Sequence, residues 1–177
     1  MKRIIIHWTA GPYTMTQADF SHYHYTIGPN GEIDHGKFSV EDNNPPLRSG
    51  RYAAHCGGGN SYAIGVALRG MAGYVNSYNL GKYPITKKQC ETAWQFIAGL
   101  CKGYGIEVTK DTVISHYEWG KKNPKTSSAG KIDITFLPHE PQLKPNQVGD
   151  YIRNKVKWYL SKPMTKAVTS ASDDEPR

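Results

Sequence analysis

Two short runs rich in β-branched residues, each followed at once by a histidine, constrain this chain more than any other feature of its sequence. One run, at 4–6, precedes His7, and the other, at 112–115, precedes His116. Such runs are typical of buried central strands. Strand ends in open α/β sheets meet at the edge where ligands bind, so the two histidines are expected to converge there. Taken singly, either histidine is better explained by a hydrogen bond to backbone at a strand end.

Helical and strand patterns alternate along the rest of the chain. Apolar residues recur at helical spacing after Thr86, a candidate N-cap, as far as the stop signals Gly103 and Gly105. Strands interleaved with helices predict an α/β fold, a single domain whose mixed central β-sheet is flanked by helices on both faces. Further helices are predicted at 16–21 and 148–159, and further strands at 23–27, around 33 and at 62–68.

A chain of 177 residues is long enough for one domain and a short tail. Composition changes after Leu160, because residues 161–177 hold no aromatic residue and their three basic residues balance three acidic ones. We therefore expect a folded domain at 1–160, which carries the whole net charge of +7, and a disordered polar tail at 161–177.

The basic character of the chain, with a pI of about 9.2, predicts a polyanionic partner or neighbour. Nucleic acid is not expected, because the sequence has no helix-turn-helix signature, no aromatic RNA-binding strand and no zinc-finger spacing. The polyanionic partners that stay open are an anionic membrane face and a cell wall. No stretch reaches the roughly 18 apolar residues of a transmembrane segment, and no signal peptide is expected at the start.

Three cysteines, an odd count without an export signal, favour reduced thiols over disulfides. Cys56 adjoins His55, and a cysteine and a histidine can act together as nucleophile and base. Neighbours along a strand point to opposite faces, however, so a cysteine hydrolase is not favoured.

A catalytic zinc ion takes three ligands from His, Cys, Asp or Glu and leaves its fourth position to water. His7 and His116 would supply two of them. Their spacing matches no short zinc motif, so the residues alone do not choose the third. The candidates are Glu118, Asp133, His139 and Glu140.

Five short motifs occur in this chain in the order found in one enzyme family. They are HWTAG at 7–11, YHYTIGPNG at 23–31, AAHCGGGNSYAIGVALRG at 53–70, ISHYEW at 114–119 and GKID at 130–133. On these motifs, residues 1–140 resemble the zinc-dependent N-acetylmuramoyl-L-alanine amidases of type 2. That family includes phage endolysins and is similar in fold to the animal peptidoglycan recognition proteins.

The resemblance implies that a zinc ion is held by His7, His116 and Asp133, the last in the family's Lys-x-Asp element. The Asp-Pro-Gly that usually follows this ligand is not kept here. Tyr23 and Lys131 fall on active-site residues of the family. In the implied hydrolysis of the amide between muramic acid and L-alanine, Lys131 would stabilise the developing oxyanion and Tyr23 would orient the water or relay a proton.

His55 and Asn60 lie in the loop that flanks the family's substrate groove, and the resemblance implies that they bind substrate. The implied substrate is bacterial peptidoglycan, and the domain at 1–160 is then an amidase catalytic domain. We expect a monomer that is made in the cytoplasm and acts on the cell wall after membrane permeabilisation, as a phage or prophage lytic enzyme does. Two alternatives stay open: a non-catalytic peptidoglycan-recognition module and a cytoplasmic amidase that recycles muropeptides.

Overall fold

Five strands form one sheet in the order β3-β2-β4-β1-β5. The computed structural model describes residues 1–163, so the tail predicted at 161–177 lies outside the described residues from position 164 onward. The strands are β1 (Arg3–Trp8), β2 (Tyr25–Ile27), β3 (Ile33–His35), β4 (Ala63–Leu68) and β5 (Val113–Ser115).

The sheet is mixed, as the sequence predicts. Strand β1 lies between β4 and β5 and is parallel to both, and β2 is parallel to β4. Strand β3 returns antiparallel to β2 after a turn in which Gly31 has φ 87°, a left-handed conformation that glycine adopts without steric cost. The central strands β1 and β4 are covered on both faces, which explains their nearly continuous apolar runs.

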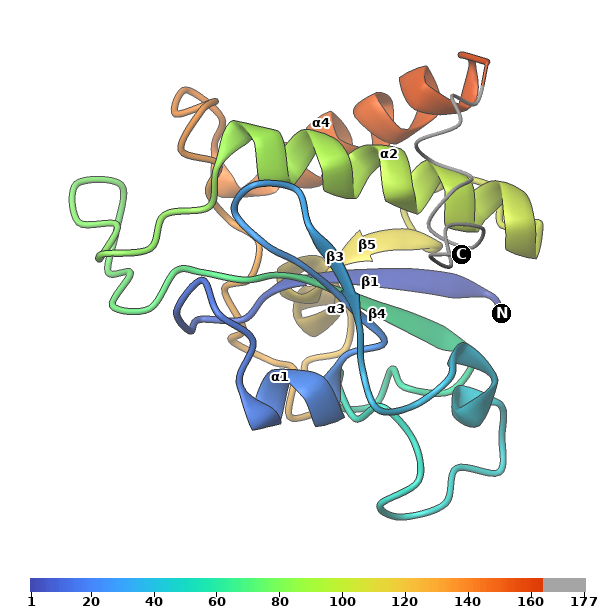
Figure 1. Ribbon diagram of the computed structural model, residues 1–177. Coiled ribbons are helices and arrows are strands. Elements are labelled where there is room, and N and C mark those ends of the chain that lie inside the picture. The colour runs from blue at the N-terminus through green and yellow to red at the C-terminus, as the bar shows by residue number, and fades with distance from the viewer. Residues whose placement is uncertain (164–177) are drawn as a thin grey trace, which may run out of the picture.

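Helices cover both faces of the sheet, which confirms the predicted α/β architecture. Helices α2 and α4 lie side by side over one face, and α1 and α3 lie on the other side (Figure 1). Within residues 1–163, no helix combines the length and the apolar character that crossing a membrane requires. The helices are α1 (Gln17–His22), the 3-10 helix η1 (Val40–Asn43), α2 (Lys87–Tyr104), α3 (His116–Lys122) and α4 (Pro145–Leu160).

Helix α2 begins and ends at the residues that the sequence marks. Thr86 is the N-cap, and its hydroxyl accepts a hydrogen bond from the Gln89 N–H at 3.1 Å, while the Gln89 side chain accepts one from the Thr86 N–H at 3.1 Å. Gly105 closes the helix with φ 65°. Cys90 and Cys101 are buried on this helix as free thiols, so both pack in the core.

Alternation along β1 decides which side of the sheet carries the chemistry. Ile4 and Ile6 point into the large core under α2 and α4. Ile5 points the other way, into a smaller cluster with Ile114 and Trp119 of α3. Since successive strand residues alternate between faces, His7 shares the face of Ile5, away from the two long helices.

Helix α3 is absent from the sequence-based prediction, which ends the strand at His116 and assigns no helix after it. A helix of seven residues is too short to show an apolar periodicity. Its start nevertheless carries a signal, because Ser115 followed three residues later by Glu118 forms a capping box. That pair makes His116 the first residue of a helix rather than the last residue of a strand.

Candidate metal centre

His7, one residue before the end of β1, and His116, directly after β5, meet at the edge of the sheet. Ile6 of β1 pairs with Ser115 of β5, so the next residues, His7 and His116, lie next to each other. Their Nδ1 atoms are 3.1 Å apart, and both side chains are buried. The predicted convergence of the two histidines is therefore what the strand register produces.

Asp133 completes the cluster from a loop that follows α3. Its Oδ2 lies 2.9 Å from Nδ1 of His7 and 3.2 Å from Nδ1 of His116. Its backbone carbonyl accepts a hydrogen bond from the Tyr117 N–H at 2.6 Å, one of the amides that the first turn of a helix leaves free. Of the four candidate third ligands, the structure brings only Asp133 to the two histidines.

The spacing of the three atoms fits a tetrahedral metal ion. Zinc bonds of about 2.0–2.1 Å to nitrogen and oxygen at tetrahedral angles place neighbouring ligand atoms about 3.3 Å apart. The two Nδ1 atoms and Oδ2 of Asp133 are 2.9 to 3.2 Å from one another, close to that spacing. This donor set of two imidazoles and one carboxylate can therefore hold a divalent metal with one position left open.

Hydrogen bonds on the far side of His116 leave its Nδ1 free for a metal. The Ser128 hydroxyl donates to the Gly57 carbonyl at 2.8 Å, so its oxygen accepts from Nε2 of His116 at 2.9 Å. A neutral His116 then carries its proton on Nε2 and presents a bare Nδ1 to the cluster. The sequence offers no signal for Ser128, which reaches His116 only through the folded path of the 123–130 loop.

The charges of the cluster suit metal binding. Burial lowers the pKa of His7, although Asp133 acts in the opposite direction, so its imidazole is neutral at pH 7. Burial would raise the pKa of Asp133, but its close contacts with His116 and His7 outweigh burial and hold that pKa below its usual value, so the carboxylate is charged. A neutral His7 imidazole and a charged Asp133 carboxylate are the protonation states in which these two groups bind a metal.

Tyr23 and Lys131 both line the cleft that opens onto the cluster, a hollow of about 770 Å³. The Tyr23 ring lies tilted against the His7 ring with 5.1 Å between centroids. Burial, with a further contribution from Asp133, raises the pKa of Tyr23 well above its usual value, so the phenol keeps its proton. Lys131 is exposed on the cleft wall, two residues before Asp133.

His55 and Asn60 also line the cleft, but the ring nitrogens of His55 and the side-chain oxygen of Asn60 already have partners inside the protein. His55 is buried with Nδ1 3.0 Å from Nε2 of His7. The Asn60 side-chain oxygen accepts from the backbone N–H groups of His55 and Cys56 at 3.0 and 2.9 Å. Their substrate-binding role stays a prediction.

Cys56 lacks the surroundings of a nucleophile. Its sulfur is buried 3.5 Å from the Ser128 hydroxyl, and the ring nitrogens of the adjacent His55 contact His7 and the Ala63 carbonyl instead. Burial raises the pKa of Cys56 to about 11, so the thiol is protonated at pH 7. The structure thus supports the packing role over the cysteine-hydrolase alternative.

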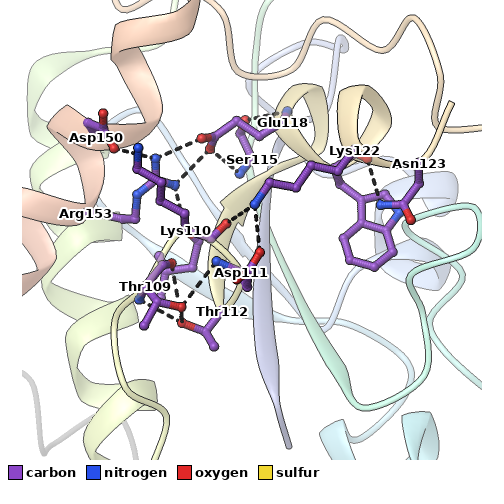
Figure 2. A network of polar contacts seen from close by, with 12 residues as sticks. Thr109, Lys110, Asp111, Thr112, Ser115, Glu118, Lys122, Asn123, Asp150 and Arg153 are labelled. Carbon is purple, nitrogen blue, oxygen red and sulfur yellow. Dashed lines mark hydrogen bonds and ion pairs between the residues drawn. The ribbon is translucent and has the colours of Figure 1, made fainter.

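Helix α3, whose first residue is His116, is anchored by a polar network (Figure 2). The side chains of Ser115 and Glu118 each accept the other's backbone N–H at 3.1 Å. Arg153 of α4 donates to both carboxylate oxygens of Glu118, at 3.0 and 2.8 Å, and Gly149 leaves room for that carboxylate because a Cβ there would overlap it. Glu118 therefore holds the helix that carries His116 and does not join the ligand cluster.

The fold and this centre define an α/β protein with a buried His-His-Asp metal-ligand cluster at the foot of an open cleft. A family model described as N-acetylmuramoyl-L-alanine amidase matches residues 1–130. The chain belongs to the N-acetylmuramoyl-L-alanine amidase family, whose substrate is peptidoglycan, as its motifs indicate. The matched segment includes His7 and His116 and ends three residues before Asp133.

Solved structures of amidases are similar to this chain at low identity. The N-acetylmuramoyl-L-alanine amidase LysC from Clostridium intestinale URNW is 20% identical, with 65% of this chain and 69% of that chain covered and a TM-score of 0.44. AmiD from E. coli, solved with anhydro-N-acetylmuramic acid-L-Ala-D-gamma-Glu-L-Lys, is 17% identical, with 66% of this chain and 48% of that chain covered and a TM-score of 0.45. No curated protein matched in sequence.

Proposed function

We propose that this protein is a zinc-dependent amidase that hydrolyses the bond between N-acetylmuramic acid and L-alanine and acts as a lytic enzyme on bacterial cell walls. One observation carries the proposal: a member of the amidase family holds His7, His116 and Asp133 together, buried, at the foot of a cleft. The net charge of +7 suits a wall that carries anionic groups.

Zinc held by these three residues would supply a water of lowered pKa, about 7 instead of 15.7, and a positive charge near the scissile carbonyl. The protein prepares the ligands for it, because the second nitrogens of His7 and His116 are already hydrogen-bonded and the Asp133 backbone is fixed by α3. Little rearrangement is then needed to bind the ion.

The two cleft residues supply the remaining chemistry. The water oxygen adds to the lactyl carbonyl carbon, and the carbon–nitrogen bond then breaks to leave a carboxylate and the amine of L-alanine. The ammonium of Lys131 stabilises the negative charge that develops on the carbonyl oxygen. The phenol of Tyr23, next to His7, orients the water and passes a proton toward the leaving amine.

The test is product analysis on purified peptidoglycan with and without a zinc chelator. We expect new amino groups whose N-terminal residue is alanine, no new reducing sugar ends, loss of release on chelation and recovery with zinc. Running intact sacculi beside soluble muropeptides separates the lytic from the recycling role, since a lytic enzyme releases product from sacculi. Binding to the wall without release of either product would contradict the proposal and favour a recognition module.

Replacing the Tyr23 hydroxyl tests its role separately from metal binding. For Tyr23→Phe we expect kcat to fall by about 10²-fold or more, the usual range for a general acid or base, with zinc affinity unchanged. The phenylalanine ring preserves the packing against His7, so folding is retained. Equal kcat values for the variant and the wild type, measured by amine release, would remove Tyr23 from the mechanism.

A further inference from the structure

One buried histidine beside the metal centre has no part in the chemistry described above. The ring of His55 lies edge-on to that of His7, with 5.2 Å between centroids and 83° between planes. Nδ1 of His55 is 3.0 Å from Nε2 of His7, and Nε2 of His55 is 3.4 Å from the carbonyl oxygen of Ala63. Both ring nitrogens are thus directed at partners inside the protein.

These contacts fix which ring nitrogen carries the proton in His55 and in His7. A carbonyl oxygen can only accept, so a neutral His55 carries its proton on Nε2, toward Ala63. Its bare Nδ1 then accepts the proton that His7 carries on Nε2. A neutral His7 with its proton on Nε2 presents a bare Nδ1 to the cluster, which is the atom that faces His116 and Asp133.

We propose that His55 is a positioning residue that holds His7 in the tautomer and orientation in which its Nδ1 binds the metal. The inference rests on the proposed zinc function of the same centre. His55 gives His7 a fixed hydrogen-bond acceptor, equivalent to the one that the Ser128 hydroxyl gives His116. Partners of this kind orient metal-binding histidines and raise the affinity of their sites.

The backbone around His55 is built to seat its ring. A Cβ at Gly65, in the middle of β4, would lie only 2.5 Å from Cγ and 2.6 Å from Cδ2 of His55, so this position must lack a side chain. In the loop that carries His55, the Asn60 side chain accepts the His55 N–H at 3.0 Å and fixes the backbone at this position. The glycine within an otherwise apolar strand is explained by the ring that lies on it.

The experiment compares zinc affinities of purified variants by competition with a chromogenic chelator. His55→Leu fills the space but cannot accept from His7, so we expect zinc to bind about 10- to 100-fold more weakly. In His55→Asn, the side-chain oxygen takes the place of Nδ1 as acceptor, so we expect affinity to recover to within a few fold of the wild type. If His55 had a purely structural role, the zinc affinities of His55→Leu and His55→Asn would not differ in this way.

His24 provides the matched control, because it is a buried histidine 5.7 Å from His55 between centroids and hydrogen-bonds Asn43 and the Gly65 N–H rather than His7. His24→Leu should lower thermal stability and leave zinc affinity unchanged. Nitrogen-15 NMR of the zinc-loaded wild type should place the proton on Nε2 of both His7 and His55, a result that does not depend on how any variant folds.

Three results would overturn the inference. In the first, His55→Leu binds zinc within twofold of the wild type, and in the second the NMR spectrum places the proton of His55 on Nδ1. Either result leaves the amidase proposal standing. In the third, the wild type itself binds no zinc, which removes the proposed function and this inference with it.

Discussion

Removal of the Asp133 carboxylate is expected to cost nearly all metal binding and activity. Structural zinc sites with four ligands bind with roughly 10 to 16 kcal/mol, so one ligand accounts for about 3 kcal/mol. For Asp133→Ala we therefore expect zinc affinity to fall by about 10²-fold or more, with a matching loss of amine release from peptidoglycan at limiting zinc. Equilibrium dialysis and product analysis on the same preparation measure the two effects together.

His139→Ala is the natural control, since His139 is another of the third-ligand candidates in the sequence and lies outside the cluster. This variant should keep the zinc affinity of the wild type. If Asp133→Ala instead binds zinc as tightly as the wild type, Asp133 is not a ligand. A pure recognition module would show a different pattern, in which muropeptide affinity survives and no amine is released by either protein.

Loss of the Arg153 side chain is expected to have the largest effect on stability. The Arg153 side chain is 6% exposed, and its guanidinium donates to the Glu118 carboxylate and to Asp150, the latter at 2.9 Å (Figure 2). It also donates to the Val113 carbonyl at 2.9 Å. In Arg153→Met, the Glu118 carboxylate keeps its charge and loses its partner. We expect the free energy of unfolding to fall by about 3 kcal/mol, measured by urea denaturation of the zinc-free protein.

A second substitution shows whether the unpaired charge of Glu118 causes the loss of stability. Glu118→Gln keeps an oxygen for the Ser115 N–H and removes the charge, so the double variant with Arg153→Met should be more stable than Arg153→Met alone. The exposed pair of Lys122 and Asp111 serves as control, and Asp111→Asn should change stability little. If the single and double variants unfold at the same urea concentration, lost packing rather than the unpaired carboxylate explains the effect.

Local patterns in the sequence predict most of the secondary structure. The capping boxes at Thr16 and Thr86 and the β-branched run before His7 act between residues a few positions apart, so the sequence itself displays them. Helix α3 and the 3-10 helix η1 are exceptions, because seven and four residues give no periodicity and only a capping box marks each of them. The mixed sheet follows from the same patterns, since interleaved strands and helices pack in few ways.

Part of the metal centre can be predicted from the sequence, and part is decided only by the structure. Placement of a histidine directly after each of two β-branched runs is a property of the sequence, and the parallel register of β1 and β5 brings the two histidines together. The sequence motifs also imply Asp133 through a family resemblance, but spacing alone leaves four candidates, because His7 and Asp133 lie 126 residues apart.

What only the tertiary structure decides is the surroundings of the ligands: His55 against His7, Ser128 against His116, and the Arg153 network behind α3. Each of these contacts joins separate segments whose meeting depends on how loops cross the sheet. Sequence periodicities of 2 and 3.6 residues report which face of a strand or helix is buried, and they carry no information about the partner on that face. The sequence by itself therefore determined most of the elements and the position of the two histidines, and the packing of distant segments decided which atoms face them.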